Sequence, residues 1–244
     1  KTASDPEQIE TWSALRDMLM PVCRIYTADA GFRVTETAIQ VHGRYGYFKG
    51  SPVEQFIRDI KINSIWELTT GIHSLIFVAQ TMPRKEGQNF AKLLGRMGQT
   101  LETYGNVEGI QDLAEDVQEK VQLLGEVGMF FGECAKKGSL LVPVSNATPF
   151  MHLMGHVCMG WLLFWQAGIA ARKLESILNT NNINPLDAQQ KGEFISQNRD
   201  AAFYEGKILG ARHFIKNILP GAEALAKGIK SEDLSLMALP VNGF

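Results

Sequence analysis

The feature of this sequence that most restricts its fold is the run from Phe150 to Ala171, which contains no Asp, Glu, Lys or Arg. Its length is near the ~20 residues that a helix needs to cross a bilayer. His152, His156 and Gln166 make the run more polar, however, and a helix that is apolar on all sides also forms the centre of a helical bundle. We therefore expect a buried core helix, with a membrane-spanning helix as the alternative.

Apolar residues elsewhere recur with the period of an α-helix. Two such stripes stand out, one from residue 110 to 131 and one from residue 204 to 218. The first contains Ile110, Leu113, Val117, Val121, Leu124 and Phe131, and the second contains Tyr204, Ile208, Ala211, Ile215 and Ile218. Strict alternation is rare and no convincing strand is found, so the sequence predicts an all-α fold built as a helical bundle.

Local signals indicate where helices begin and end. Ser51–Glu54 has the form of a capping box, with an N-cap serine followed by a proline at the first helical position. Asn184–Pro185 predicts another helix start. Breaks are expected at Pro83–Gly87, at Pro143–Pro149 and at Pro220–Gly221, and the first of these is a candidate domain boundary.

Charge and cysteine content restrict the class of protein. The chain has 244 residues, of which 45% are hydrophobic and 20% charged, and its formal net charge is −2. That balance favours a soluble protein and gives no overall field that attracts nucleic acid or an acidic membrane. Cys23, Cys134 and Cys158 are far apart, which favours reduced thiols and a cytoplasmic location. Because the first residue is Lys1 and no signal peptide follows, we expect the sequence to start partway through a longer gene product.

His152 and His156 lie one helical turn apart on one face, a spacing that can bind a metal. The glutamate that follows the first histidine in zinc proteases is absent, because Leu153 stands there, and no third ligand is evident nearby. We therefore predict no metal site and expect both histidines to be hydrogen-bonded within a bundle.

The segment Gly43–Tyr47 is rich in glycine but lacks the glycine spacing of a dinucleotide-binding fingerprint. The preceding segment, Thr35–Val41, has a helical pattern rather than that of a strand. The composition predicts a loop between helices, in which glycine permits close approach of the backbone to a ligand or a neighbouring subunit.

Glu67 is placed between Trp66 and Leu68 in a mostly apolar segment. Removal of a carboxyl from water disfavours its charged form, and a carboxylate tuned in this way is a better general base near neutral pH. The alternative is a glutamate at a helix end whose side chain reaches solvent. Spacing alone leaves both interpretations open.

Three motifs, in order and at matching spacing, resemble the C-terminal part of the acyl-CoA dehydrogenases. Gln40–Tyr47 resembles the family's QVHGGYGY loop, Pro52–Glu54 with Arg58–Asp59 resembles PVE…RD, and Ile65–Ile72 resembles IYEGTxxIQ. More loosely, Phe150–Arg172 and Phe203–Pro220 resemble the helical extension of one subgroup.

That resemblance implies residues 1–82 as part of the dehydrogenase C-terminal helical bundle and residues 83–244 as the helical extension domain. The family's N-terminal helical domain and middle β-domain would lie outside this chain. The fragment alone is accordingly expected to be inactive.

The resemblance implies that Glu67 is the catalytic base, which removes the α-proton of an acyl-CoA thioester. The β-hydride passes to FAD, and a trans-2-enoyl-CoA results, the chemistry of fatty-acid β-oxidation. An electron-transferring flavoprotein then reoxidises the flavin. Hydrogen bonds to the thioester carbonyl, one of them from the backbone N–H of the base, would stabilise the developing negative charge.

Cofactor contacts follow from the same resemblance. Thr69 aligns with a threonine at the flavin diphosphate of its own subunit, and Thr70 is its neighbour. Gln40 and Gly43 align with residues that reach the FAD of a neighbouring subunit, which implies a homodimer.

Four positions depart from the family's pattern, and the replacement of a tyrosine by Trp66 is a mild change. Arg44 replaces a glycine of the loop, where a guanidinium can pair with phosphate. Leu68 replaces the glycine that lies against the acyl thioester, and His73 replaces a glutamine. Because Leu68 narrows the expected pocket and the family's other domains are missing, a non-catalytic helical dimerisation module is the alternative function. The uncharged run Phe150–Ala171 motivates a further alternative, a membrane-associated helical protein.

Overall fold

The computed structural model describes residues 5–67, 69–240 and 242. Every regular element in these residues is a helix, which confirms the all-α prediction. The contacts divide the chain into two compact units. The first unit comprises Lys1–Leu93, Val127–Gly155 and Lys227–Phe244, and the second comprises Leu94–Glu126 and His156–Ala226. The division at residue 82 that the resemblance implies stays a prediction.

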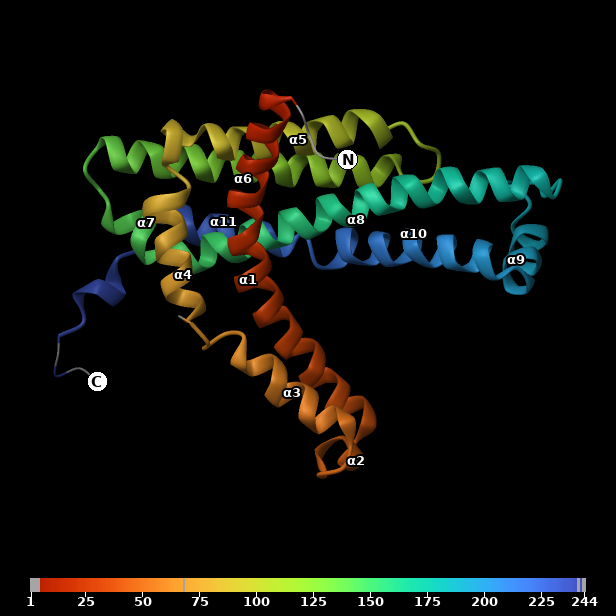
Figure 1. Ribbon diagram of the computed structural model, residues 1–244, viewed down its shortest axis with the longest axis horizontal. Coiled ribbons are helices and arrows are strands. Elements are labelled where there is room, and N and C mark those ends of the chain that lie inside the picture. The colour runs from red at the N-terminus through yellow and green to blue at the C-terminus, as the bar shows by residue number, and fades with distance from the viewer. Residues whose placement is uncertain (1–4, 68, 241, 243–244) are drawn as a thin grey trace. The chain divides into compact units, whose positions relative to one another are not determined.

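The first unit begins with the long helix α1 (Pro6–His42), whose N-cap Asp5 accepts a hydrogen bond from the Glu7 N–H. α1 ends at Gly43, and the short helix α2 (Arg44–Tyr47) follows. α3 (Pro52–Ile62) then returns along α1, so the three helices form an arm with α2 at its tip (Figure 1). The helix start predicted at Ser51–Glu54 is confirmed, although the Ser51 side chain makes no capping hydrogen bond.

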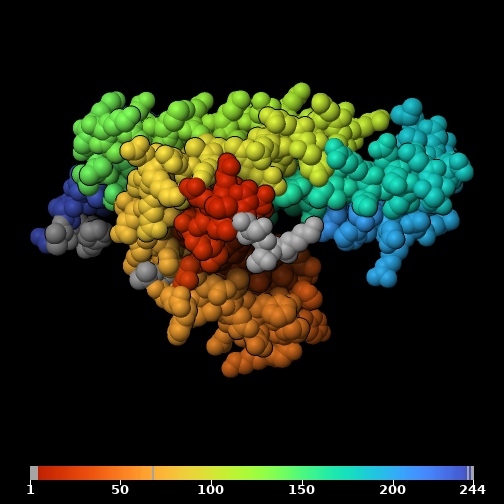
Figure 2. All heavy atoms as spheres, turned by 45° about the horizontal axis from the view of Figure 1, so that its top comes forward, coloured from red at the N-terminus to blue at the C-terminus, as the bar shows by residue number. Residues whose placement is uncertain are grey.

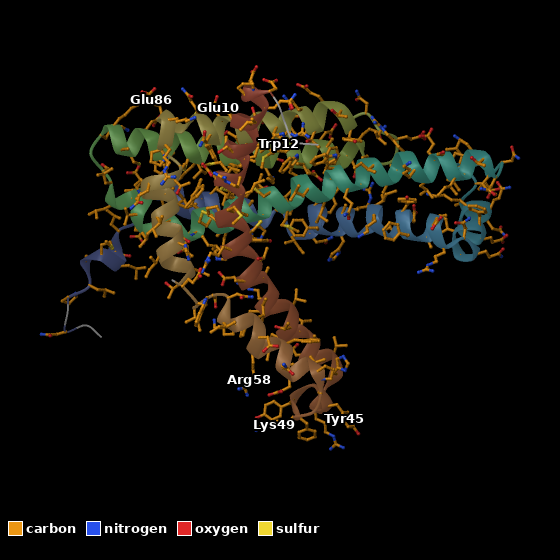
Figure 3. The ribbon with its side chains drawn as sticks, viewed as in Figure 1. Glu10, Trp12, Tyr45, Lys49, Arg58 and Glu86 are labelled. Carbon is orange, nitrogen blue, oxygen red and sulfur yellow. The ribbon has the colours of Figure 1, made fainter. Side chains whose placement is uncertain are left out.

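After α3 the chain turns into α4 (Thr70–Ile76), which continues as the π-helix η1 (Phe77–Thr81). The 3₁₀ turn η2 (Arg84–Gly87) follows, with Lys85 and Glu86 in left-handed conformations. This turn confirms the break predicted at Pro83–Gly87. The Glu10 carboxylate of α1 forms ion pairs with Lys85 at 2.9 Å and with Lys92 at 3.1 Å. These contacts hold the segment Pro83–Gly87 against the start of α1 (Figure 3).

Aromatic rings make the core of the first unit. Phe150 is fully buried, and its ring centroid lies 5.0 Å from that of Phe131, 6.3 Å from that of Phe90 and 6.4 Å from that of Phe77. Aromatic pairs at these distances stabilise a core beyond the area that they bury.

The break predicted at Pro143–Pro149 is narrower than expected. The short helix α7 (Leu141–Ser145) includes Pro143, and the long helix α8 (Ala147–Thr180) already includes Pro149. Only Asn146 separates them. A proline is tolerated in the first turn of a helix, where its missing N–H would have no partner.

The second unit contains parts of α5 (Gln88–Tyr104), α6 (Gln111–Lys136) and α8, together with α9 (Ala188–Gln197), α10 (Arg199–Asn217) and most of α11 (Gly221–Lys230). The last element, the 3₁₀ turn η3 (Ser235–Ala238), belongs to the first unit. α10 packs back along α8 (Figure 1). Most of each predicted stripe faces the core: Ile110, Leu113, Val117, Leu124, Ala211 and Ile215 are buried, whereas Ile218 at the end of the second stripe is exposed.

α8 contains the uncharged run and is long and apolar enough to cross a membrane, with a mean hydropathy of 1.3 over its most apolar window. Of that window, 61% is buried inside the protein. Phe150, Leu153 and Phe164 have no exposed surface. This burial favours the core-helix interpretation.

The helix start predicted at Asn184–Pro185 is wrong by three residues. α9 begins at Ala188, because the Asp187 side chain accepts hydrogen bonds from the N–H groups of Gln189 and Gln190. The Asn184 side chain instead accepts from the Leu186 N–H and closes a turn. Asp187 therefore provides the stronger cap for the free N–H groups of the first helical turn.

Candidate active site

Glu67 lies in a turn between α3 and α4, not on a helix. The turn is closed by hydrogen bonds from the Trp66 N–H to the Ile62 carbonyl at 2.8 Å and from the Thr70 N–H to the Ser64 carbonyl at 3.3 Å. Glu67 itself has φ 62°. This left-handed conformation is uncommon for a residue with a side chain and persists only where the surrounding structure holds it.

Arg24, on α1, holds this turn from outside. Its Nη1 atom donates to the Glu67 carboxylate at 3.0 Å, and its Nη2 atom donates to the Trp66 carbonyl at 2.7 Å. The Arg24 side chain is 34% exposed and the Glu67 side chain 65% exposed. The guanidinium therefore binds both the carboxylate and the peptide group that precedes it.

In this chain by itself, the Glu67 side chain is not removed from water. Its neighbours Ile65 and Trp66 are exposed as well, so the apolar residues around it in sequence form no core. Because α3 ends at Ile62, these side chains lie on a turn and do not share one buried face of a helix. The alternative interpretation, a carboxylate that reaches solvent near a helix end, describes the geometry.

His73, on the first turns of α4, adds to the electrostatics of this region. Burial lowers the pKa of His73, and the positive charge of Arg24 lowers it further, while Glu67 opposes both effects. Within the part of the chain that the structure describes, His73 Nε2 and Arg24 Nε are buried and without a hydrogen-bond partner. A lowered pKa keeps His73 neutral near pH 7, so Arg24 supplies the positive charge beside Glu67.

The two predicted flavin-contacting threonines lie directly after this turn. Thr69 is the N-cap of α4, and its hydroxyl accepts a hydrogen bond from the Ile72 N–H at 3.4 Å. Thr70 is the first residue of that helix. The structure thus brings Thr69 and Thr70 close to Glu67, as the sequence motif requires. Leu68, the predicted substrate-contacting residue, lies outside the described residues.

The other predicted cofactor residues lie at the tip of the arm. Gln40 is near the end of α1, Gly43 has φ 59° with open space where a Cβ would stand, and the Arg44 guanidinium lies 5.8 Å from the Tyr45 ring centroid. Sixteen residues of α1 separate Arg24 from Gln40, about 24 Å at the helical rise. The predicted site residues therefore form two groups at opposite ends of the arm.

The surface of the tip is aromatic and basic. Tyr45, Tyr47 and Phe48 are exposed around it. Figure 3 shows Tyr45 and Lys49 extending outward at the tip of the arm and Arg58 extending outward from α3, and Figure 2 shows one face of these segments exposed. An exposed set of rings and cations of this kind suits contact with another surface or an anionic ligand.

His152 is bound within the first unit. Its Nε2 atom lies 3.2 Å from the Asp29 carboxylate, and the Tyr26 ring meets it edge-on with centroids 6.3 Å apart. No group of three potential metal ligands occurs among the described residues. The interpretation as a paired histidine is favoured for His152.

Sequence reasoning missed Arg24. It lies 43 residues before Glu67, and none of the motifs includes it. Its position on the face of a long helix gives no local signal, so the contact is visible only in the folded chain.

Comparison with known proteins identifies the class to which this fold and site belong. The family described as "Acyl-CoA dehydrogenase, C-terminal domain" matches residues 7–82, and the family described as "Acetyl-CoA dehydrogenase C-terminal like" matches residues 93–240. The fold is therefore that of the C-terminal helical domains of acyl-CoA dehydrogenases. The chain belongs to the acyl-CoA dehydrogenase family.

Individual relatives agree. A butyryl-CoA dehydrogenase of Syntrophomonas wolfei is 27% identical over 99% of this chain and 37% of its own length. A broad-specificity linear acyl-CoA dehydrogenase of Mycobacterium tuberculosis is 26% identical over 94% of this chain and 36% of its own length. An acryloyl-CoA reductase (NADH) of Anaerotignum propionicum is 34% identical over 34% of this chain and 23% of its own length. The chain thus spans little more than a third of the relatives that cover it most fully.

Proposed function

We propose that this chain is the C-terminal part of an FAD-dependent acyl-CoA dehydrogenase, which converts an acyl-CoA thioester into a trans-2-enoyl-CoA. The observation that carries the proposal is the match of residues 7–82 and 93–240 to the C-terminal domains of that family. The names of the relatives, a butyryl-CoA dehydrogenase and a linear acyl-CoA dehydrogenase among them, support an acyl-CoA substrate.

Glu67 is the proton acceptor in this proposal. An ionised carboxylate takes the proton from Cα of the thioester, and the electron pair of that C–H bond becomes the second bond between Cα and Cβ. FAD, when bound, supplies the acceptor for the hydride that leaves Cβ. The ion pair with Arg24 at 3.0 Å restrains the direction of this carboxylate.

Covering the turn would complete this chemistry. In this chain Glu67 is 65% exposed, and Ile65 and Trp66 beside it are exposed apolar residues. Apolar surface of this kind around a charged group is suited to burial against further protein, which excludes water from the reacting atoms. We infer that the remaining part of a longer protein covers this surface.

The two groups of predicted cofactor residues are suited to a diphosphate. Arg44 carries an exposed guanidinium, and Gly43 leaves the backbone open to close approach. Gln40 adds an exposed amide, while Thr69 and Thr70 offer hydroxyls beside Glu67. Because the groups lie at opposite ends of the arm, we infer a homodimer in which the tip of one subunit reaches the FAD of the other.

The remaining parts of the proposal come from the family, except for the location, which rests on the scattered cysteines. An electron-transferring flavoprotein would reoxidise the flavin, and the location would be cytoplasmic. Leu68 beside the base would shape the acyl pocket.

Substitution of the base tests the proposal. In the longer polypeptide that carries this chain, purified with FAD, Glu67→Gln is expected to retain the yellow flavin and to lose exchange of the substrate α-proton with deuterated water. Glu36→Gln, at an exposed position on α1, is the matched control and should exchange as the unmodified protein does. Undiminished exchange in Glu67→Gln would contradict the assignment.

A non-catalytic dimerisation module is the second candidate, and the exposure of Glu67 favours it. The same preparation separates the two functions. A longer protein that is colourless, and that stays inert to acyl-CoA after FAD is added, supports the module. A flavin spectrum that is bleached by an acyl-CoA supports the enzyme.

A further inference from the structure

The turn that carries Glu67 needs support from outside itself. Its own hydrogen bonds use the backbone of Ile62, Ser64, Trp66 and Thr70, and none of them engages the Glu67 side chain. Glu67 also has φ 62°, a conformation that is unfavourable for a residue with a Cβ. A contact that fixes the carboxylate and the adjacent peptide group together would hold both the conformation and the direction of the side chain.

Arg24 makes such a contact with two different nitrogens. Nη1 lies 3.0 Å from the Glu67 carboxylate, and Nη2 lies 2.7 Å from the Trp66 carbonyl. The planar guanidinium fixes the relative positions of these two donors, so one side chain restrains the peptide before Glu67 and the carboxylate itself. α1 supplies a rigid base for it, because Val22 and Ile25 on either side of Arg24 are buried.

The charges that face Glu67 come from two helices. Arg24 on α1 is the paired cation, and His73 on α4 is the other titratable group that interacts with both.

We propose that Arg24 is a positioning residue for the proton transfer: its guanidinium holds the Trp66–Glu67 turn in its left-handed form and fixes the direction of the carboxylate that takes the substrate α-proton. This inference rests on the proposed function, because it assigns a role in that reaction. Arg24 does not touch the reacting atoms and acts through Glu67.

Two variants in the FAD-loaded longer protein separate the charge from the geometry. Arg24→Gln removes the charge, whereas Arg24→Lys keeps the charge but replaces the two-pronged guanidinium with a single ammonium. Arg16→Gln is the matched control, because Arg16 lies on the same helix and pairs with its neighbour Asp17. The readout is the rate of α-proton exchange in deuterated water as a function of pH, together with the flavin content.

For Arg24→Gln we expect a plateau rate lower by roughly 10- to 100-fold, since a small displacement of a reacting group costs this much. For Arg24→Lys we expect a plateau lower by roughly 3- to 10-fold, because a single ammonium cannot make both contacts of the guanidinium. Arg16→Gln should match the unmodified protein in both measurements.

An unchanged plateau rate in Arg24→Gln would overturn the proposal. If that variant fails to fold, Arg24→Lys decides: a lower plateau with unchanged flavin content supports the positioning role, and an unaltered plateau overturns it. Absence of α-proton exchange in the unmodified protein would overturn the proposed function and this inference together. If the unmodified protein exchanges the α-proton and the Arg24 variants exchange it equally fast, only the role of Arg24 is overturned.

Discussion

Gly155 of α8 lies directly against the Tyr26 ring of α1, within the first unit. A Cβ added at Gly155 would lie 2.8 Å from the Tyr26 Cβ and would overlap the ring. The absence of a side chain at Gly155 therefore sets how closely these two helices approach.

Gly155→Ala is expected to destabilise the protein by about 1–3 kcal/mol, the usual cost of overpacking a core. Urea unfolding monitored by circular dichroism measures the change. Gly132→Ala is the matched control: Gly132 lies on α6 with no atom within 4 Å of an added Cβ, and alanine there should stabilise the helix by about 0.5–1 kcal/mol. Equal effects of the two substitutions would show that the close approach of Gly155 to Tyr26 is unimportant.

Phe150→Ala is expected to cost about 3–5 kcal/mol, because it removes a fully buried ring that contacts Phe77, Phe90 and Phe131. The midpoint of urea unfolding should fall accordingly. Phe56→Ala provides the comparison, since Phe56 is exposed on α3 and its loss should change stability by less than about 0.5 kcal/mol. A cost below about 1 kcal/mol for Phe150→Ala would contradict the central place of this ring.

Asp112 should make the second unit sensitive to acid. Hydrogen bonds from Arg212, the shorter at 2.6 Å, hold the pKa of Asp112 below its ordinary value of 3.8, and Lys216 at 3.1 Å adds to the effect. A lowered pKa in the folded state contributes stability that is present above pH 3.8 and is lost as the pH falls through the folded value.

Asp112→Asn should therefore flatten the loss of stability below about pH 4. The difference at neutral pH should be under about 1 kcal/mol, because both partners of the ion pair are partly exposed. Thermal unfolding at a series of pH values measures it, with Glu102→Gln at an exposed position of α5 as the control. An acid dependence in Asp112→Asn as steep as that of the unmodified protein would refute the assignment.

His73 should make the turn region sensitive to a milder acid range. Its pKa is lowered by burial and by Arg24, so the folded state favours the neutral ring. The stability that this contributes is fully present above the ordinary pKa of about 6.5 and is lost as the pH falls through the lower, folded value.

His73→Gln is expected to reduce the drop in melting temperature between about pH 7.5 and about pH 5.5, because glutamine does not titrate. The measurement is a pair of melting curves at the two pH values. His42→Gln, at an exposed residue near the end of α1, should leave the drop unchanged. A drop in His73→Gln as large as in the unmodified protein would exclude His73 as its source.

Much of the fold could be read from local pattern. The stripes at 110–131 and 204–218, the break at Pro83–Gly87 and the buried run in α8 were all predictable, since each depends on residues a few positions apart on one helix. The start of α9 was misjudged although it too is local. Asn184 and Asp187 were both possible N-cap residues. The Asp187 side chain accepts hydrogen bonds from two N–H groups of the first turn of α9, and Asn184 accepts none from that turn.

The candidate site was less predictable. Its motifs place Glu67, Thr69 and Thr70 together because they are adjacent in sequence. Whether the Glu67 carboxylate is removed from water depends on which helices pack beside it. The apolar residues around Glu67 in the sequence are consistent with burial, but the side chain is exposed in the folded chain.

The order of amino acids alone was sufficient for the helical class, the core faces and the family motifs, because helix periodicity and motif spacing are short-range properties of a chain. The folded arrangement was needed for the contact between Arg24 and Glu67, which joins residues 43 positions apart, for the ring cluster around Phe150 and for the exposure of the base. These features arise where distant segments pack against one another, and the free energy of that packing is shared among many side chains rather than encoded at any one of them.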